Sequence, residues 1–180
     1  MIGCSEYGEL REQDGFEAFQ DIPESMSDVK VVKAGLRRLD FDKEDIHVLL
    51  DPSFMDIKLA IGETCNTIIR SYMEEEQNTL LFVYFAGHGS MDNTTKAMLN
   101  GKRHYPLEKS LRNLAKCDGS YVMGVFDCCR EKLDASLATR GGGGAADILD
   151  DEDDDDNFNV EDSQENFIMT YGCQPSSGVP

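Results

Sequence analysis

The sequence predicts an α/β fold: a three-layer sandwich in which a mostly parallel central sheet carries helices on both faces. Two apolar runs, residues 80–86 and 121–126, are rich in β-branched and aromatic side chains, which is typical of strands buried on both sides. Segments with helical periodicity separate the predicted strands, and strands that alternate with helices form a parallel sheet joined by right-handed crossovers. The 180 residues suffice for one domain with a real core.

The N-terminal part is expected to supply one strand and one helix. Residues 1–4 indicate the end of a first strand, and residues 5–24 indicate a loop. Ser25 or Ser27 can cap a helix whose first turn contains Asp28, where a negative charge suits the helix dipole. Apolar side chains then recur at helical spacing.

The next segment repeats the pattern of strand and helix. Residues 46–50 predict a short strand, and the turn signal Asp51-Pro52-Ser53 closes it. Residues 57–72 have the periodicity of an amphipathic helix. The apolar strand at 80–86 follows and runs into His88, which stands between two glycines.

The region between the two apolar strands predicts mostly loop and one helix. Residues 90–105 are polar, with a short hairpin expected around Asn100-Gly101. Pro106 suits the first turn of a third helix, in which three leucines share one face. Asp118-Gly119 indicates a turn into the strand at 121–126.

After residue 130, the sequence loses the alternation of predicted strands and helices and becomes rich in glycine and acidic residues. Residues 131–139 are ambiguous between helix and coil, and residues 140–163 contain four glycines followed by a run of acids. Because such sequence cannot bury apolar surface, we predict that 140–163 is a disordered linker. Residues 167–173 predict a last strand.

The net charge and the hydropathy of the chain limit the classes of partner and the cellular location that we expect. The formal net charge is −18, and residues 150–156 supply seven of the acids. This balance argues against nucleic acid as a partner, since phosphates demand a basic face; it is compatible with basic substrates. No apolar run has the length of a membrane span, and no signal peptide is visible. We therefore expect a cytoplasmic protein with no membrane partner.

Cysteine usage favours free thiols in a reducing compartment. No C-x-x-C pair exists, so a structural zinc site is not expected. The cysteines expected to pack in the interior are Cys4, Cys65, Cys117 and Cys128.

His88 and Cys129 could form a catalytic dyad. Each residue follows an apolar strand, and one crossover separates the two strands, so we expect the strands to be adjacent or nearly adjacent. A nearby imidazole can take the proton of a thiol and so create the nucleophilic thiolate. The alternative is that His88 only ends a strand and that Cys129 packs in the core. We expect His47 and His104 to lie at the surface or at a strand edge.

Two short motifs carry a resemblance to a known family. Phe85-Ala86-Gly87-His88-Gly89 and Asp127-Cys128-Cys129-Arg130 resemble the caspase-like cysteine peptidases, the clan of caspases, paracaspases and metacaspases. The resemblance implies a caspase-like fold, with Cys129 as the nucleophile and His88 as the base. It also implies that the backbone N–H groups of Gly89 and Cys129 hold the oxyanion.

The resemblance also bears on substrate preference. Metacaspases and paracaspases cut after Arg or Lys and carry an acid where this chain has Asp127. Metacaspases add a second acid at the start of the first helix, and Ser25-Met26-Ser27-Asp28 resembles that segment. Two carboxylates could bind a guanidinium, so a peptide or protein substrate with a basic residue at the cleavage site is expected. The alternative is that Asp28 and Asp127 are ordinary acids at a helix start and a strand end.

In the family's terms, residues 1–139 correspond to the large-subunit region, 140–163 to the linker and 164–180 to the start of a truncated small-subunit region. No cofactor is expected; calcium-dependent metacaspases carry acids after the cysteine, where this chain has Arg130-Glu131-Lys132, so matching positions do not support a calcium site. Missing groove elements favour an alternative function, a catalytically silent module that binds partners. Self-association through the sheet edge stays open.

Overall fold

A computed structural model describes residues 1–7, 20–91, 94–99, 103–128, 130–132 and 166–172. Its main sheet has five parallel strands in the order β2-β1-β3-β7-β9. The five strands are β1 (Ile2–Gly3), β2 (Leu49–Leu50), β3 (Thr79–Ala86), β7 (Ser120–Asp127) and β9 (Phe167–Tyr171). The two apolar runs thus form the adjacent central strands β3 and β7, as predicted.

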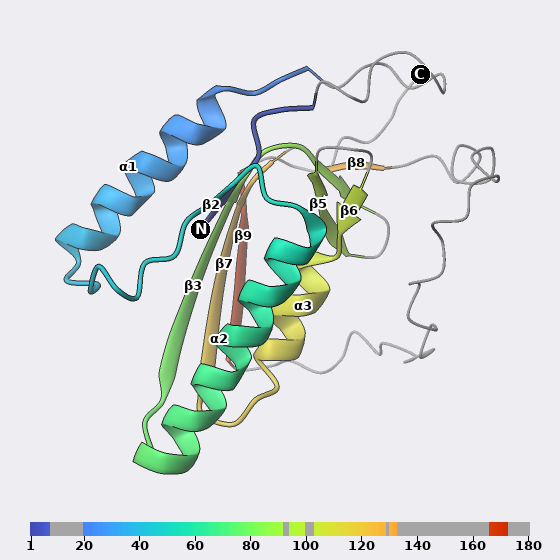
Figure 1. Cartoon of the computed structure of the whole chain (residues 1–180). Helices are drawn as coiled ribbons and strands as arrows, with labels where there is room; N and C mark the ends of the chain where they lie inside the picture. Colours follow the sequence, from blue (N-terminus) through green and yellow to red (C-terminus); the bar gives the residue numbers. More distant parts are fainter. Residues whose placement is uncertain (8–19, 92–93, 100–102, 129, 133–165, 173–180) are drawn as a thin grey trace.

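Three helices cover the two faces of this sheet, which confirms the predicted fold class. Helix α1 (Glu24–Arg38) lies on one face, and α2 (Phe54–Glu75) and α3 (Leu107–Leu114) lie on the other (Figure 1). Successive side chains of β3 point to opposite faces. Tyr84 and Ala86 therefore pack with α1, whereas Val83 and Phe85 pack in the larger core with α2 and α3.

A second sheet, which the sequence did not predict, stands at the carboxyl ends of β3 and β7. Its strands, in the order β6-β5-β4-β8, are β4 (Gly89–Met91), β5 (Thr95–Leu99), β6 (Arg103–Tyr105) and β8 (Arg130–Lys132). The expected hairpin is present as the antiparallel pair β5 and β6. Strands β4 and β8 are three residues each and mostly polar, so they show no periodicity that a sequence pattern could reveal.

Helix α1 begins differently from the prediction. Its N-terminal flanking residue is Pro23, and neither Ser25 nor Ser27 caps it. Ser25 lies inside the first turn, where its buried hydroxyl donates to the carbonyl oxygens of Cys4 and Ile22, at 2.9 Å each. The hydroxyl therefore ties the helix to the segment after β1. Asp28 lies one turn further along the helix.

Helix α2 is longer than predicted because its cap lies further upstream. Ser53 accepts from the backbone N–H of Asp56, and the Asp56 carboxylate accepts from the backbone N–H of Ser53. This reciprocal capping box satisfies two helix-end donors, and it starts the helix at Phe54. The predicted strand at 46–50 shortens to Leu49–Leu50.

Glu108 of α3 joins both sheets. Its carboxylate accepts from the backbone N–H of Thr95 in β5 at 2.8 Å and from the hydroxyl of Tyr171 in β9 at 2.8 Å. Arg112 donates to it through two nitrogens, at 2.8 and 3.1 Å. Burial acts to raise the pKa of Glu108, but these hydrogen bonds outweigh it, so the pKa is lowered. The charged form is thus part of the native packing.

The last predicted strand is present as Phe167–Tyr171 and pairs with β7 along its length. The predicted linker, residues 140–163, lies outside the described residues, and so do residues 173–180.

Candidate active site

The strand register brings the two predicted motifs to one edge of the main sheet. Ala86 at the end of β3 pairs with Asp127 at the end of β7. Three residues later, Gly89 in β4 pairs in parallel with Arg130 in β8. Cys129 itself lies outside the described residues. The segments on either side of it are nevertheless paired with the segments on either side of His88.

His88 is held by three segments of the chain. Its backbone N–H donates to the hydroxyl of Tyr7 at 2.9 Å, and its carbonyl oxygen accepts from the N–H of Met98 at 3.0 Å. The ring of Tyr7 meets the imidazole edge-on, with centroids 4.6 Å apart. Nε2 of the imidazole lies 2.9 Å from the carbonyl oxygen of Gln20.

The contact with Gln20 selects the tautomer of His88. A carbonyl oxygen can only accept a hydrogen bond, so Nε2 must carry the proton in this contact. In the neutral imidazole, the proton-accepting nitrogen is then Nδ1. The hydrogen bond thus fixes the orientation of the ring and leaves Nδ1 as the nitrogen that can accept a proton.

Tyr7 is a site residue that the sequence did not reveal. It falls in the segment predicted to be loop, yet its side chain is fully buried. Its hydroxyl donates to the carbonyl of Cys4 at 3.3 Å while it accepts from His88. Burial raises the pKa of this phenol, so it stays protonated. No local sequence signal marks a buried tyrosine within a polar segment.

Gly87 is required by this packing. Its φ is +150°, which side-chain-bearing residues rarely adopt, and a β-carbon at this position would lie 2.6 Å from the hydroxyl oxygen of Tyr7. The glycine before the histidine therefore lets Tyr7 reach the backbone of His88.

A cavity of about 190 Å³ opens beside His88 and contains both predicted pocket acids. Asp28 reaches it from α1, and Asp127 reaches it from the end of β7. Its lining is completed by Ile22, Ser25, Ala86, Gly87 and Cys128. Among these described lining residues there is no lysine or arginine, so the cavity suits a positively charged group.

Tyr84 supports the Asp127 side of this cavity. Its hydroxyl donates to a carboxylate oxygen of Asp127 at 3.2 Å. The pKa of Tyr84 is raised by burial first, and then by the negative charges of Asp127 and Asp28. Asp127 contacts this hydroxyl directly and Asp28 lines the same cavity, so the two negative charges share one site.

Cys128 and Gly89 are the sequence neighbours of the two predicted dyad residues. Cys128 lies in the main core, and Gly89 lies in the second sheet. Cys128 is 3% exposed and packs in the main core, as expected. The N–H of Met98 donates to the carbonyl oxygen of His88, and Gly89 is paired with Ala97 between them. In an antiparallel ladder this arrangement means that Gly89 and Ala97 face each other without bonding to each other. The N–H of Gly89 consequently points away from β5, toward the side where β8 pairs.

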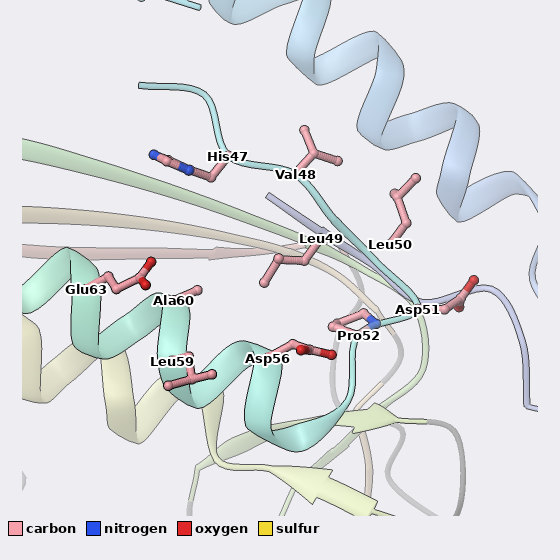
Figure 2. Close-up of a pocket in the computed structure, with 10 residues that line it drawn as sticks. All are labelled: His47, Val48, Leu49, Leu50, Asp51, Pro52, Asp56, Leu59, Ala60 and Glu63. Atoms are coloured by element: carbon pink, nitrogen blue, oxygen red, sulfur yellow. The ribbon is translucent and has the colours of Figure 1, made fainter. Parts of the chain in front are cut away.

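A second hollow of about 350 Å³ lies at the β2 edge of the main sheet, between the segment that contains β2 and the first half of α2 (Figure 2). Two of its acids already have structural partners: Asp51 accepts from Ser5 and Glu6, and Asp56 belongs to the capping box. His47 in its lining is exposed. We therefore read this hollow as part of the fold, with no catalytic arrangement.

His104 belongs to the second sheet. Its Nδ1 lies 3.0 Å from the hydroxyl oxygen of Ser90 in β4. Among the described residues, no three His, Cys, Asp or Glu side chains gather closely enough to hold a metal ion. Within the same part of the chain, none of the helices is both long and apolar enough to cross a bilayer.

Comparison with known proteins agrees with the fold. The sequence model of the caspase domain matches residues 1–178, nearly the whole chain. No curated protein matches the chain.

Proposed function

The chain belongs to the caspase domain family, a family of cysteine peptidases, and from this premise we propose that it is an endopeptidase that cuts after arginine or lysine. The observation that carries the proposal is the shared cavity of His88, Asp28 and Asp127, beside the strand end that leads to Cys129. It combines a general base with two negative charges.

In the proposed mechanism, Nδ1 of His88 takes the proton of the Cys129 thiol. The thiolate attacks the carbonyl carbon of the peptide bond, and the backbone N–H groups of Gly89 and Cys129 stabilise the oxyanion. Collapse of this intermediate releases the amine, which takes its proton from His88. Water activated by His88 then hydrolyses the thioester.

Asp28 and Asp127 would bind the basic side chain that precedes the cut bond. A guanidinium can donate to two carboxylates at once, and such charge-assisted hydrogen bonds are the strong ones. The cavity offers it no opposing lysine or arginine among its described lining residues. An acidic side chain in the same place would face two like charges, so cleavage after aspartate is not expected.

The test is hydrolysis of fluorogenic peptides that end in arginine, lysine or aspartate. We expect turnover of the first two, its abolition in Cys129→Ala, and most of it retained in Cys128→Ala. The Cys128 variant is the matched control, because it removes the neighbouring thiol. Equal activity in the Cys129 variant would overturn the mechanism. A folded wild-type protein that cleaves none of the peptides would favour the partner-binding alternative.

A further inference from the structure

Cys65 and Cys117 form a close pair of thiols away from the candidate active site. Cys65 lies on α2, and Cys117 lies in the turn between α3 and β7. Their sulfur atoms are 3.9 Å apart and in hydrogen-bonding contact, although 52 residues separate them in the sequence. Both side chains are half-buried, so small reagents can reach them.

The turn that carries Cys117 is held firmly against α2. Ser120 is fully buried, and its hydroxyl donates to the carbonyl oxygens of Leu114 and Cys117, at 2.8 and 2.7 Å. Gly119 packs directly on the ring of Tyr72, where a β-carbon would overlap the ring. Tyr72 is seven residues after Cys65, so the two share one face of the helix.

The other described cysteines differ from this pair. Cys4 is 2% exposed, and burial together with the charge of Asp51 raises its pKa to about 12. Cys128 is 3% exposed. Thiolate character and access decide which cysteines oxidise, so both of these are poor targets.

The contact between the two sulfur atoms decides the outcome of an oxidation. The pKa of Cys117 is raised by burial first, and then by the hydrogen bond and charge of Cys65 and by the charge of Asp118. Once either sulfur is oxidised, the other thiol lies next to it and can resolve it.

We propose that Cys65 and Cys117 are a peroxide-sensitive dithiol that closes to a disulfide between α2 and the turn before β7. The thiolate of one cysteine attacks one oxygen of hydrogen peroxide; the O–O bond breaks, hydroxide leaves and is protonated to water, and that cysteine becomes a sulfenic acid. The thiol of the other cysteine then loses its proton and attacks the sulfenic acid sulfur, which releases a second water. Two thiols are oxidised by two electrons, and one peroxide is reduced to two waters.

The geometry requires only a small closure. A disulfide has a sulfur–sulfur bond of about 2.05 Å, so the sulfurs must approach from 3.9 Å. Rotation of the two side chains about their Cα–Cβ bonds moves sulfur over this range. The proposal does not depend on the peptidase activity.

The test is to treat the full chain with hydrogen peroxide, block remaining thiols, and digest it on the N-terminal side of aspartates. This digestion puts Cys65 in residues 56–91 and Cys117 in residues 92–117, with no other cysteine in either peptide. We expect the two peptides to be joined, with the loss of two hydrogens, and to separate on addition of dithiothreitol. The oxidised protein should also melt several degrees higher than the reduced protein.

Two single variants serve as controls. In Cys117→Ser and in Cys65→Ser the joined peptide should be absent, and the remaining cysteine should oxidise beyond the sulfenic acid to the sulfinic acid, because its resolving thiol is gone. The rise in melting temperature should vanish in both. Recovery of both peptides unlinked from oxidised wild-type protein, or linkage of either cysteine mainly to another cysteine, would overturn the proposal.

Discussion

Removal of the Tyr7 hydroxyl should loosen His88. The hydroxyl makes two hydrogen bonds, accepting from the His88 N–H and donating to the Cys4 carbonyl. In Tyr7→Phe the Cys4 carbonyl keeps the hydrogen bond from Ser25, so the cost falls on the His88 N–H, which loses its acceptor. An unsatisfied donor at a buried position costs about 1–3 kcal/mol. The unfolding free energy should fall by that amount.

The same variant should affect catalysis more than its stability suggests. Displacement of a reacting group by about 1 Å can cost on the order of 10²-fold in rate, and Tyr7 positions the backbone that carries the imidazole. We expect kcat for an arginine-ended peptide to fall at least about tenfold, with a smaller change in KM. Ring ¹⁵N shifts should show whether His88 keeps its proton on Nε2.

Urea unfolding measures the stability change, and Tyr121→Phe is the matched control, since Tyr121 is 46% exposed. Tyr7→Leu should lose about 0.5–1.5 kcal/mol more than Tyr7→Phe, because it also removes the edge-on contact with the imidazole. If Tyr7→Phe keeps wild-type stability and wild-type kcat, the hydroxyl does not hold His88, and this reading of the site is wrong.

Two further predictions concern charge. Asp127→Asn keeps an acceptor for Tyr84 but removes a negative charge, so kcat/KM for an arginine-ended peptide should fall about 10- to 100-fold. The control variant Asp118→Asn should leave kcat/KM unchanged. An equal loss in both variants would refute the pocket assignment. Glu108→Gln should lower the unfolding free energy at pH 7 by about 2–4 kcal/mol, measured by urea unfolding. Because the folded-state pKa of Glu108 is lowered, its contribution is present at neutral pH and lost as pH falls through that pKa. The gap between Glu108→Gln and wild type should therefore shrink in acid; a gap independent of pH would show that the charge of Glu108 is not what stabilises the fold.

The main sheet was predictable because its central strands are buried on both faces. Such strands appear as continuous apolar runs, and residues 80–86 and 121–126 are the clearest such runs in the chain. Their adjacency follows the general tendency of strands that are consecutive along the chain and joined by one crossover to lie side by side. The meeting of His88 and Asp127 at one sheet edge was therefore accessible from sequence alone.

The support of the site was not predictable in the same way. Tyr7 and Gln20 contact His88 across 81 and 68 residues of sequence, from a segment with no periodicity. Ser25 was expected to cap a helix because its type favours that position, but the Cys4 carbonyl competes for its hydroxyl. Such contacts depend on tertiary packing, which overrides local preference.

The most direct test of the catalytic claim is affinity labelling with an arginine chloromethyl ketone, with the adduct located by mass spectrometry. A basic side chain held by Asp28 and Asp127 should present the reactive carbon to the thiolate that His88 generates. We expect a single adduct on Cys129, its loss in His88→Ala, and slower labelling in Asp127→Asn. An adduct on Cys128, or no adduct on a folded protein, would contradict the account.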